Sequence, residues 1–176
     1  MSSDFKTPGD RIYLCGESHQ ELGASELAYM LRDETQGQSG IGGRVPEIDT
    51  TRNLAMYRAL TAAMQKSLVA SAHDCSDGGL AVALSECCFG SDSGARIDIS
   101  AIMSDCDQIE PWGAMFGESL GRILVSVKAE NKEAFETSMI GHACYSLGVV
   151  EEGDTISVTN GAVSYTHLRA HETHTN

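Results

Sequence analysis

The stretch of residues 73–89 constrains the fold of this chain most, because it predicts where a strand ends and where a helix begins. A short apolar run at residues 67–72 precedes it and suits a buried strand. After Gly79 the apolar residues recur at helical spacing, and Gly90 is placed to end the helix. Residues 74–79 are therefore predicted to form a strand-to-helix turn.

Two glycines, Gly78 and Gly79, stand at the start of the predicted helix. Because glycine has no Cβ, a ligand can approach backbone N–H groups that lack an intrahelical partner and lie at the positive end of the helix dipole. We predict that Ser76, Asp77 and the two glycines form an anion-binding turn. The alternative is a plain helix start that Ser76 or Asp77 caps. Asp77 would repel a bare phosphate, so such a ligand would need a cation.

The chain is strongly acidic, and this limits its partners. It has 12 lysines and arginines against 25 aspartates and glutamates, a net charge of −13. With no basic patch to displace counterions, we expect neither nucleic acid nor an anionic membrane as a partner. The N-terminus has no apolar signal core, and no run approaches the roughly 20 apolar residues that cross a bilayer. We therefore expect a cytoplasmic protein.

Cysteine and histidine are the remaining candidates for special chemistry. The six cysteines are scattered without a Cys-x-x-Cys pair, which predicts buried thiols in a reducing compartment. His19 is predicted to be a surface histidine. Residues 163–176 hold three of the six histidines, a metal-binding alternative, but they lack the His-Glu-x-x-His motif. We interpret this tail as non-native or disordered and expect no metal site.

The rest of the chain predicts strands that alternate with helices. The expected strands are residues 11–15, 95–100, 122–128, 145–150 and 155–159, and the expected helices are residues 25–31, 46–66 and 131–140. Residues 33–46 are interpreted as a flexible linker. The long helix is expected to bury a broad apolar stripe, made of Leu54, Tyr57, Met64 and Leu68 with Met56, Leu60 and Ala63 beside them.

This order of elements predicts an α+β fold in which helices cover a layered sheet. We divide the chain into three parts. Residues 1–20 are expected to be the end of a preceding domain with its entry strand, residues 21–162 the main domain, and residues 163–176 the tail.

Four blocks, in this order along the chain, resemble one family. They are Pro-Gly-Asp-Arg-Ile-Tyr-Leu-Cys-Gly-Glu-Ser at 8–18, Glu-Leu-Gly-Ala-Ser-Glu at 21–26, His-Asp-Cys-Ser-Asp-Gly-Gly-Leu-Ala-Val-Ala-Leu-Ser-Glu at 73–86 and Phe-Gly-Glu-Ser-Leu-Gly-Arg-Ile-Leu-Val-Ser-Val at 116–127. Together they resemble the synthetase component of phosphoribosylformylglycinamidine synthase, in the AIR synthase-related C-terminal domain of its second unit. The likeness covers about residues 4 to 160.

The resemblance implies an AIR synthase C-terminal domain-like fold and part of a purine-biosynthesis ligase. In that family, formylglycinamidine ribonucleotide is made from formylglycinamide ribonucleotide, ATP and glutamine-derived ammonia, with Mg²⁺ shielding the phosphates. The implied cofactors of the full-length enzyme are thus ATP and Mg²⁺. The implied partners are the upstream domains of the same enzyme, a glutaminase subunit or domain, and the nucleotide substrate.

The resemblance also implies site residues. Glu118, Ser119 and Leu120 match a Glu-Ser-Gln triplet that touches the nucleotide substrate in the first unit of the family. Leu120 lacks the amide, and the catalytic histidine lies in domains upstream, so we expect no catalytic residue here and no activity of the fragment alone. The 76–79 turn would contribute to an auxiliary nucleotide pocket. The alternatives are a stand-alone nucleotide- or anion-binding module, or another relative such as AIR synthase or selenophosphate synthetase.

Overall fold

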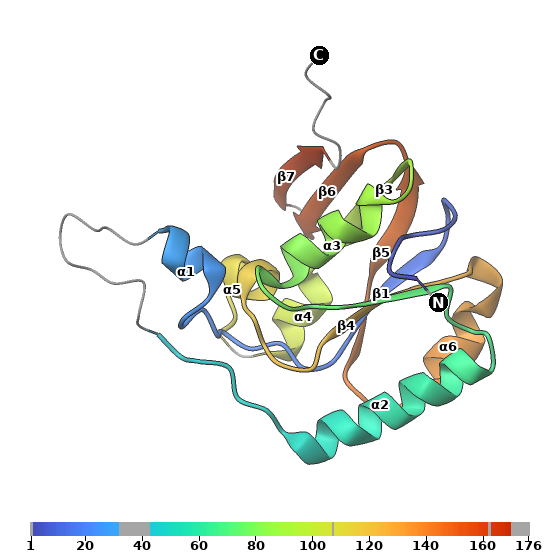
Figure 1. Ribbon diagram of the computed structural model, residues 1–176, viewed down its shortest axis with the longest axis horizontal. Coiled ribbons are helices and arrows are strands. Elements are labelled where there is room, and N and C mark those ends of the chain that lie inside the picture. Colours follow the sequence, from blue (N-terminus) through green and yellow to red (C-terminus); the bar gives the residue numbers. More distant parts are fainter. Residues whose placement is uncertain (1, 32–42, 107, 162, 170–176) are drawn as a thin grey trace.

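Seven strands form one mixed sheet in the computed structural model, which describes residues 2–31, 43–106, 108–161 and the backbone of 163–169. The strand order is β2-β4-β1-β5-β3-β6-β7 (Figure 1), and all neighbours are antiparallel except β3 and β6. The strands are β1 (Arg11–Cys15), β2 (Ser71–Asp74), β3 (Ser93–Asp98), β4 (Ile123–Val127), β5 (Cys144–Glu152), β6 (Thr155–Asn160) and β7 (Val163–Arg169). The predicted α+β fold is confirmed.

Helices cover both faces of the sheet. They are α1 (Glu26–Met30), α2 (Thr50–Gln65), α3 (Gly79–Phe89), α4 (Ser100–Asp105), α5 (Pro111–Phe116) and α6 (Lys132–Ser138), with a short 3₁₀ turn at Ala129–Asn131. Helices α3, α4 and α5 lie on one side of the sheet and α2 and α6 on the other (Figure 1). None of the helices in the described part of the chain has the length and apolar character that a membrane span requires.

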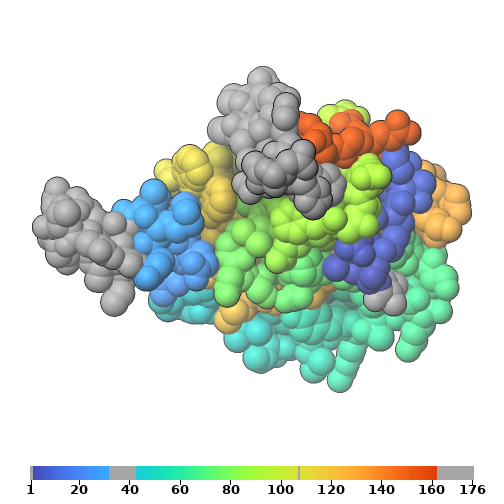
Figure 2. Space-filling view, turned by 45° about the horizontal axis from the view of Figure 1, so that its top comes forward, coloured from blue at the N-terminus to red at the C-terminus, as the bar shows by residue number. Residues whose placement is uncertain are grey.

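Strand β1 shows how the alternation of side chains builds two hydrophobic cores. Successive residues of a strand point to opposite faces. Ile12 and Leu14 therefore join the core under α3, whereas Tyr13 and Cys15 join the core under α2 and α6. Phe5 also lies in the first core, and its N–H donates to the carbonyl of Cys87 at 2.9 Å. The N-terminal segment consequently packs beside α3 (Figure 2).

Two helix predictions are confirmed and one needs correction. The helix predicted at residues 25–31 is present as α1, which Ser25 caps by accepting the N–H of Ala28, and α3 ends before Gly90, as predicted. Helix α2, however, begins at Thr50 and not at residue 46, because Asp49 caps it. Its predicted buried face is partly wrong.

The buried residues of α2 are Asn53, Met56, Leu60 and Ala63. Leu54 is 50% exposed and Tyr57 is 36% exposed. The helix has its own apolar side chains on most of its faces. The periodicity of the sequence therefore does not identify the face that packs against the sheet.

The structure shows which strands lie on either side of the two predicted domain limits, at residues 20 and 162. The limits themselves remain predictions. β1 lies between β4 and β5, in the same layer as the residues of the main domain. The backbone of residues 163–169 pairs with β6 as β7, although the sequence predicts a tail outside the fold. Backbone pairing needs no apolar period, which is why the sequence did not indicate this strand. Most of the predicted linker and the side chains of the tail histidines lie outside the described residues.

Candidate functional site

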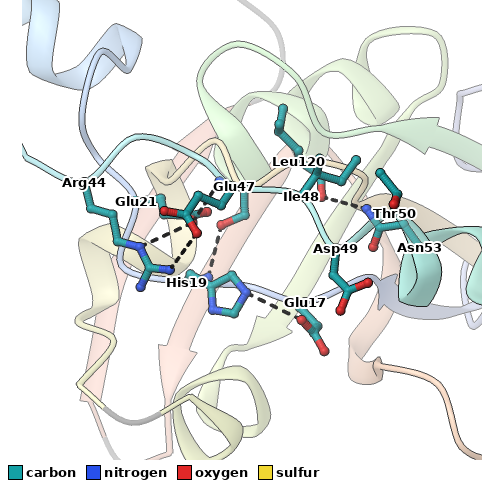
Figure 3. Close-up of a pocket in the computed structure, with 11 residues that line it drawn as sticks. Glu17, His19, Glu21, Arg44, Glu47, Ile48, Asp49, Thr50, Asn53 and Leu120 are labelled. Atoms are coloured by element: carbon teal, nitrogen blue, oxygen red, sulfur yellow. Dashed lines mark hydrogen bonds and ion pairs between the residues drawn. The ribbon is translucent and has the colours of Figure 1, made fainter.

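The loop of residues 117–122 joins α5 to β4 and separates two cavities. The first, here called the turn cavity, has a volume of about 410 Å³ and is lined by Pro46, Tyr57, Asp74, Cys75, Ser76, Asp77, Glu118, Leu120, Gly121, Arg122 and Ile123. The second, here called the acidic cavity, has a volume of about 420 Å³ and is lined by Glu17, His19, Glu21, Arg44, Glu47, Ile48, Asp49, Thr50, Asn53, Ser119 and Leu120 (Figure 3).

The turn before α3 has the predicted position but not the predicted cap. Gly78 is the N-cap with φ of 77° and has no side chain of its own, so the cap assigned to Ser76 or Asp77 is wrong. The hydroxyl of Ser76 instead donates to Asp74 Oδ2 at 2.5 Å. Gly79 has φ of 64°, and a Cβ there would collide with the carbonyl oxygen of Gly117. The glycines are therefore required by the backbone conformation and by close packing.

Glu118 connects the beginnings of two helices. Its Oε1 accepts the N–H of Gly78 at 2.9 Å and the N–H of Glu26 at 2.9 Å. The N–H of Gly79 donates to the carbonyl of Ser76 at 3.0 Å. The anion at the positive end of α3 is thus the carboxylate of Glu118. A ligand anion that used the N–H of Gly78 would have to replace it.

Arg122 holds the 117–122 loop in shape from inside the protein. The residue is 1% exposed, and its guanidinium donates to the carbonyls of Gly117 and Ser119 and, at 3.2 Å, to the hydroxyl of Ser18. Burial lowers the pKa of Arg122, while the nearby charges of Glu21 and Glu118 act in the opposite direction. The buried cation is therefore compensated by carboxylates and carbonyls on both sides of the loop.

The turn cavity presents negative charge to its opening. Asp74 and Asp77 are exposed, and Glu118 is half-buried. The hydroxyl of Ser76 lowers the pKa of Asp74, so this carboxyl is ionised over a wider pH range than usual. No three metal-binding side chains lie together among the described residues. Carboxylate oxygens do suit Mg²⁺, which is usually held by one or two carboxylates together with substrate phosphates.

The acidic cavity contains a fully buried carboxylate (Figure 3). Glu21 is 0% exposed, and its Oε1 accepts the N–H of Glu47 at 3.2 Å and lies 3.8 Å from Arg44 Nε. The hydroxyl of Ser119 accepts the N–H of His19 at 3.0 Å. These bonds hold residues 43–48 and the 117–122 loop against residues 16–25. The visible role of these contacts is to position the segments around the loop.

The predicted site residues are thus divided between the two sides of the loop. Ser76, Asp77 and Glu118 line the turn cavity, and Gly78 and Gly79 are buried behind it. Ser119 lines the acidic cavity instead. Ligand binding by these residues remains a prediction.

Sequence reasoning missed three residues: Asp74, Glu21 and Arg122. The signal for Arg122 was a charged residue directly before the apolar run of β4, where a buried cation is unusual. Asp74 had a weaker signal, its place at the end of β2 beside the glycine turn. Nothing in the sequence near Glu21 indicated that it would be buried.

The turn cavity also has an apolar rim. Tyr57 is 36% exposed and Leu120 is 49% exposed, and both line the cavity together with Pro46. Exposed apolar side chains beside convergent polar groups are typical of small-molecule sites. This arrangement can accept the flat apolar part of a ligand at the rim and its charged part, with a cation, near Asp74 and Asp77.

Several solved structures share this fold. Thermotoga maritima PurL in complex with FGAR is 18% identical, with a TM-score of 0.82 over 97% of this chain and 28% of that chain. Phosphoribosylformylglycinamidine synthase II from the same organism is 17% identical, with a TM-score of 0.77 over 97% and 26%. Escherichia coli HypE, a hydrogenase maturation protein, is 16% identical, with a TM-score of 0.64 over 94% and 50%. The chain therefore spans about a quarter of the PurL chains.

At these identities the structural likeness establishes the fold, and the family follows from the sequence. The model of the AIR synthase related protein, C-terminal domain, matches residues 7–160. This range includes six of the seven strands and the whole 117–122 loop. The chain therefore belongs to the AIR synthase related family, as its C-terminal domain.

Proposed function

We propose that this chain is the C-terminal domain of a phosphoribosylformylglycinamidine synthase, an ATP-dependent ligase of purine biosynthesis. In this proposal it supplies one wall of a nucleotide-binding cleft and has no activity by itself. The fold supports this assignment, since one PurL complex with FGAR and others with ATP, ADP and AMPPCP share it. The remaining three quarters of such an enzyme would supply the other wall.

The observation that carries the proposal is the composition of the turn cavity. An ionised Asp74 and an exposed Asp77 lie beside a hydroxyl, and an aromatic ring and Leu120 form the rim. A nucleotide needs an apolar contact for its base and a cation for its phosphates. Asp74 and Asp77 are the residues that would hold Mg²⁺ together with those phosphates.

The proposed reaction joins ammonia to formylglycinamide ribonucleotide at the expense of ATP. The bound Mg²⁺ would neutralise phosphate charge, and the protein would position the reactants. The proposal assigns the rest of the chemistry to upstream domains. It also implies a glutaminase subunit or domain as the source of ammonia, and a cytoplasmic location.

Calorimetry tests the nucleotide site. We expect the chain to bind ADP with Mg²⁺. The affinity should fall at least about tenfold after Asp74→Asn or Asp77→Asn, because each change removes a charged oxygen ligand of the metal. The control is Glu133→Gln, which removes the same charge from an exposed position on α6. The proposal would be contradicted if the two aspartate variants bound ADP with Mg²⁺ as tightly as the wild type and the Glu133→Gln control did. It would also be contradicted if the wild type bound ADP equally well with and without Mg²⁺.

Turnover measurements test the claim that the chain is incomplete. The purified chain supplied with ATP, formylglycinamide ribonucleotide and ammonium should produce no ADP above background. ADP and amidine formation by the chain alone would overturn this part of the proposal. The calorimetric result would still stand in that case.

The alternative is a stand-alone nucleotide- or anion-binding module, or another relative such as AIR synthase or selenophosphate synthetase. HypE shares the fold and is only about twice as long as this chain, but its TM-score of 0.64 is lower than the 0.82 of PurL. The genomic reading frame before Met1 separates these cases. A frame that continues into a paired synthetase unit would support the ligase, and a stop codon directly upstream would support the module.

A further inference from the structure

Two cysteines lie directly opposite each other on the neighbouring strands β1 and β5. Cys15 is the last residue of β1 and Cys144 the first residue of β5, and they are direct partners in the antiparallel pairing. Their Sγ atoms lie 3.6 Å apart, where either thiol can donate to the other. Both are free cysteines.

The register places this pair where a disulfide fits without moving the strands. The N–H of Gly16 donates to the carbonyl of Ala143 at 2.9 Å, so the next pair inward, Cys15 and Cys144, is a non-hydrogen-bonded pair. Directly opposed residues of that kind have Cα atoms roughly 4.5 Å apart, within the roughly 4.4–6.8 Å that a disulfide spans. Closing the bond therefore needs side-chain rotation and only a small approach of the sulfurs.

The two thiols differ in access. Cys15 is 0% exposed, whereas Cys144 is half-buried. A cavity of about 280 Å³ is lined by Gly16 and Ala143, which are the chain neighbours of the two cysteines, and by Arg52. A small reagent therefore reaches Cys144 first. Cys15 then lies opposite the mixed disulfide that forms on Cys144 and can react with it.

We propose that Cys15 and Cys144 form a reversible dithiol–disulfide pair that responds to low-molecular-weight disulfides such as oxidised glutathione. The disulfide would fasten the start of residues 16–25, which carry Glu21 and lead into α1, to the start of β5. It would thereby rigidify one side of the acidic cavity. This inference does not depend on the ligand proposed above.

The reaction is a thiol–disulfide exchange in two steps. The thiolate of Cys144 attacks one sulfur of oxidised glutathione, forms a mixed disulfide and releases one glutathione thiolate. Cys15 then loses its proton, attacks the sulfur of Cys144 and releases the second glutathione. The two protein thiols together lose two electrons and two protons, and one oxidised glutathione becomes two reduced glutathiones.

The environment of Cys15 supports this order of events. Its hydrogen bond with Cys144 and its burial raise the pKa of Cys15 well above the ordinary value. A buried thiol that stays protonated is a poor first nucleophile. It becomes the second reactant once the mixed disulfide lies directly opposite.

Peptide mapping by mass spectrometry tests the pair. After treatment with oxidised glutathione and alkylation, we expect a crosslinked peptide that contains Cys15 and Cys144, lighter by about 2 Da than the two thiol peptides. The Cys15→Ser variant is the control, because Cys144 then has no opposite thiol. Cys144 should keep glutathione as an adduct in this variant and not in the wild type.

Further measurements distinguish the pair from simple surface oxidation. The bond would close a loop of 129 residues, so the oxidised chain should melt several degrees higher than the reduced chain, and dithiothreitol should reverse the shift. Hydrogen exchange at Gly16 should slow in the oxidised wild type and stay unchanged in Cys144→Ser. A stable glutathione adduct on Cys144 in the wild type, with Cys15 still a free thiol, would overturn the proposal.

Discussion

Replacement of Arg122 by methionine should destabilise this domain strongly, because it removes a buried cation whose partners cannot be satisfied by water. The guanidinium donates to the carbonyls of Gly117 and Ser119 and to the hydroxyl of Ser18, and all three residues are buried. A buried acceptor left without a donor costs about 1–3 kcal/mol. Removal of the charge also takes away the favourable interaction of this cation with Glu21 and Glu118.

These contributions are partly offset, because methionine has no charge to desolvate. Loss of one partner from a buried ionic network usually costs about 3–5 kcal/mol, and we expect Arg122→Met to fall in this range. Arg122→Lys should lie between this variant and the wild type, since an ammonium keeps the charge but cannot reach three acceptors in different directions.

Urea unfolding followed by circular dichroism measures the effect as a change in the free energy of unfolding. The matched control is Arg96→Met, because Arg96 is an arginine that pairs with the carboxylate of Glu151 at 2.6 Å but is 64% exposed. An exposed pair contributes less than about 1 kcal/mol. If Arg122→Met lost no more stability than this control, the reasoning about the buried network would be refuted.

Three further predictions concern the turn and its surroundings. Glu118→Ala should lose about 2–3 kcal/mol in the same unfolding assay, and Glu118→Gln about half of that, because glutamine keeps an acceptor for the two N–H groups. Gly79→Ala should cost more than about 2 kcal/mol, whereas Gly141→Ala should cost about 1 kcal/mol. Both glycines have positive φ, but a Cβ at Gly141 meets nothing within 4 Å. Finally, the depressed pKa of Asp74 stabilises the fold above about pH 4 and this contribution is lost as the pH falls through the folded-state pKa. The melting temperature of Asp74→Asn should therefore fall less than that of the wild type between pH 6 and pH 3, and equal slopes would contradict the assignment.

The local elements of the fold could be predicted because their signals are short-range. The strand predicted at residues 122–128 is present as β4, and the helix predicted at residues 131–140 is present as α6. The order of the strands could not be predicted, because the position of β1 between β4 and β5 depends on pairings distant in the sequence. Helix α2 shows a second limit, since it has apolar residues on more than one face and only the sheet decides which face is buried.

The candidate site was predicted in part for the same reason. The glycine turn is a local signal, and the structure places it at a cavity. The role of Glu118 depends on N–H donors that are 40 and 92 residues away, and no local pattern encodes them. Ser119 follows Glu118 directly but lines the other cavity, so two adjacent residues of one motif need not serve one ligand.

The carboxylate of Glu118 occupies the N–H of Gly78 that the proposed phosphate ligand would use. Direct binding to the N–H of Gly78 would displace Glu118 and free the N–H of Glu26, so it would loosen the starts of α3 and α1 together. A phosphate that approaches through Mg²⁺ avoids this cost, because Asp74 and Asp77 are already exposed at the opening. The same negative charge that repels a bare phosphate attracts Mg²⁺, which can then bind the phosphate oxygens. We therefore expect the proposed nucleotide to bind only with Mg²⁺ and through the aspartates, while the two glycines serve the packing of the turn.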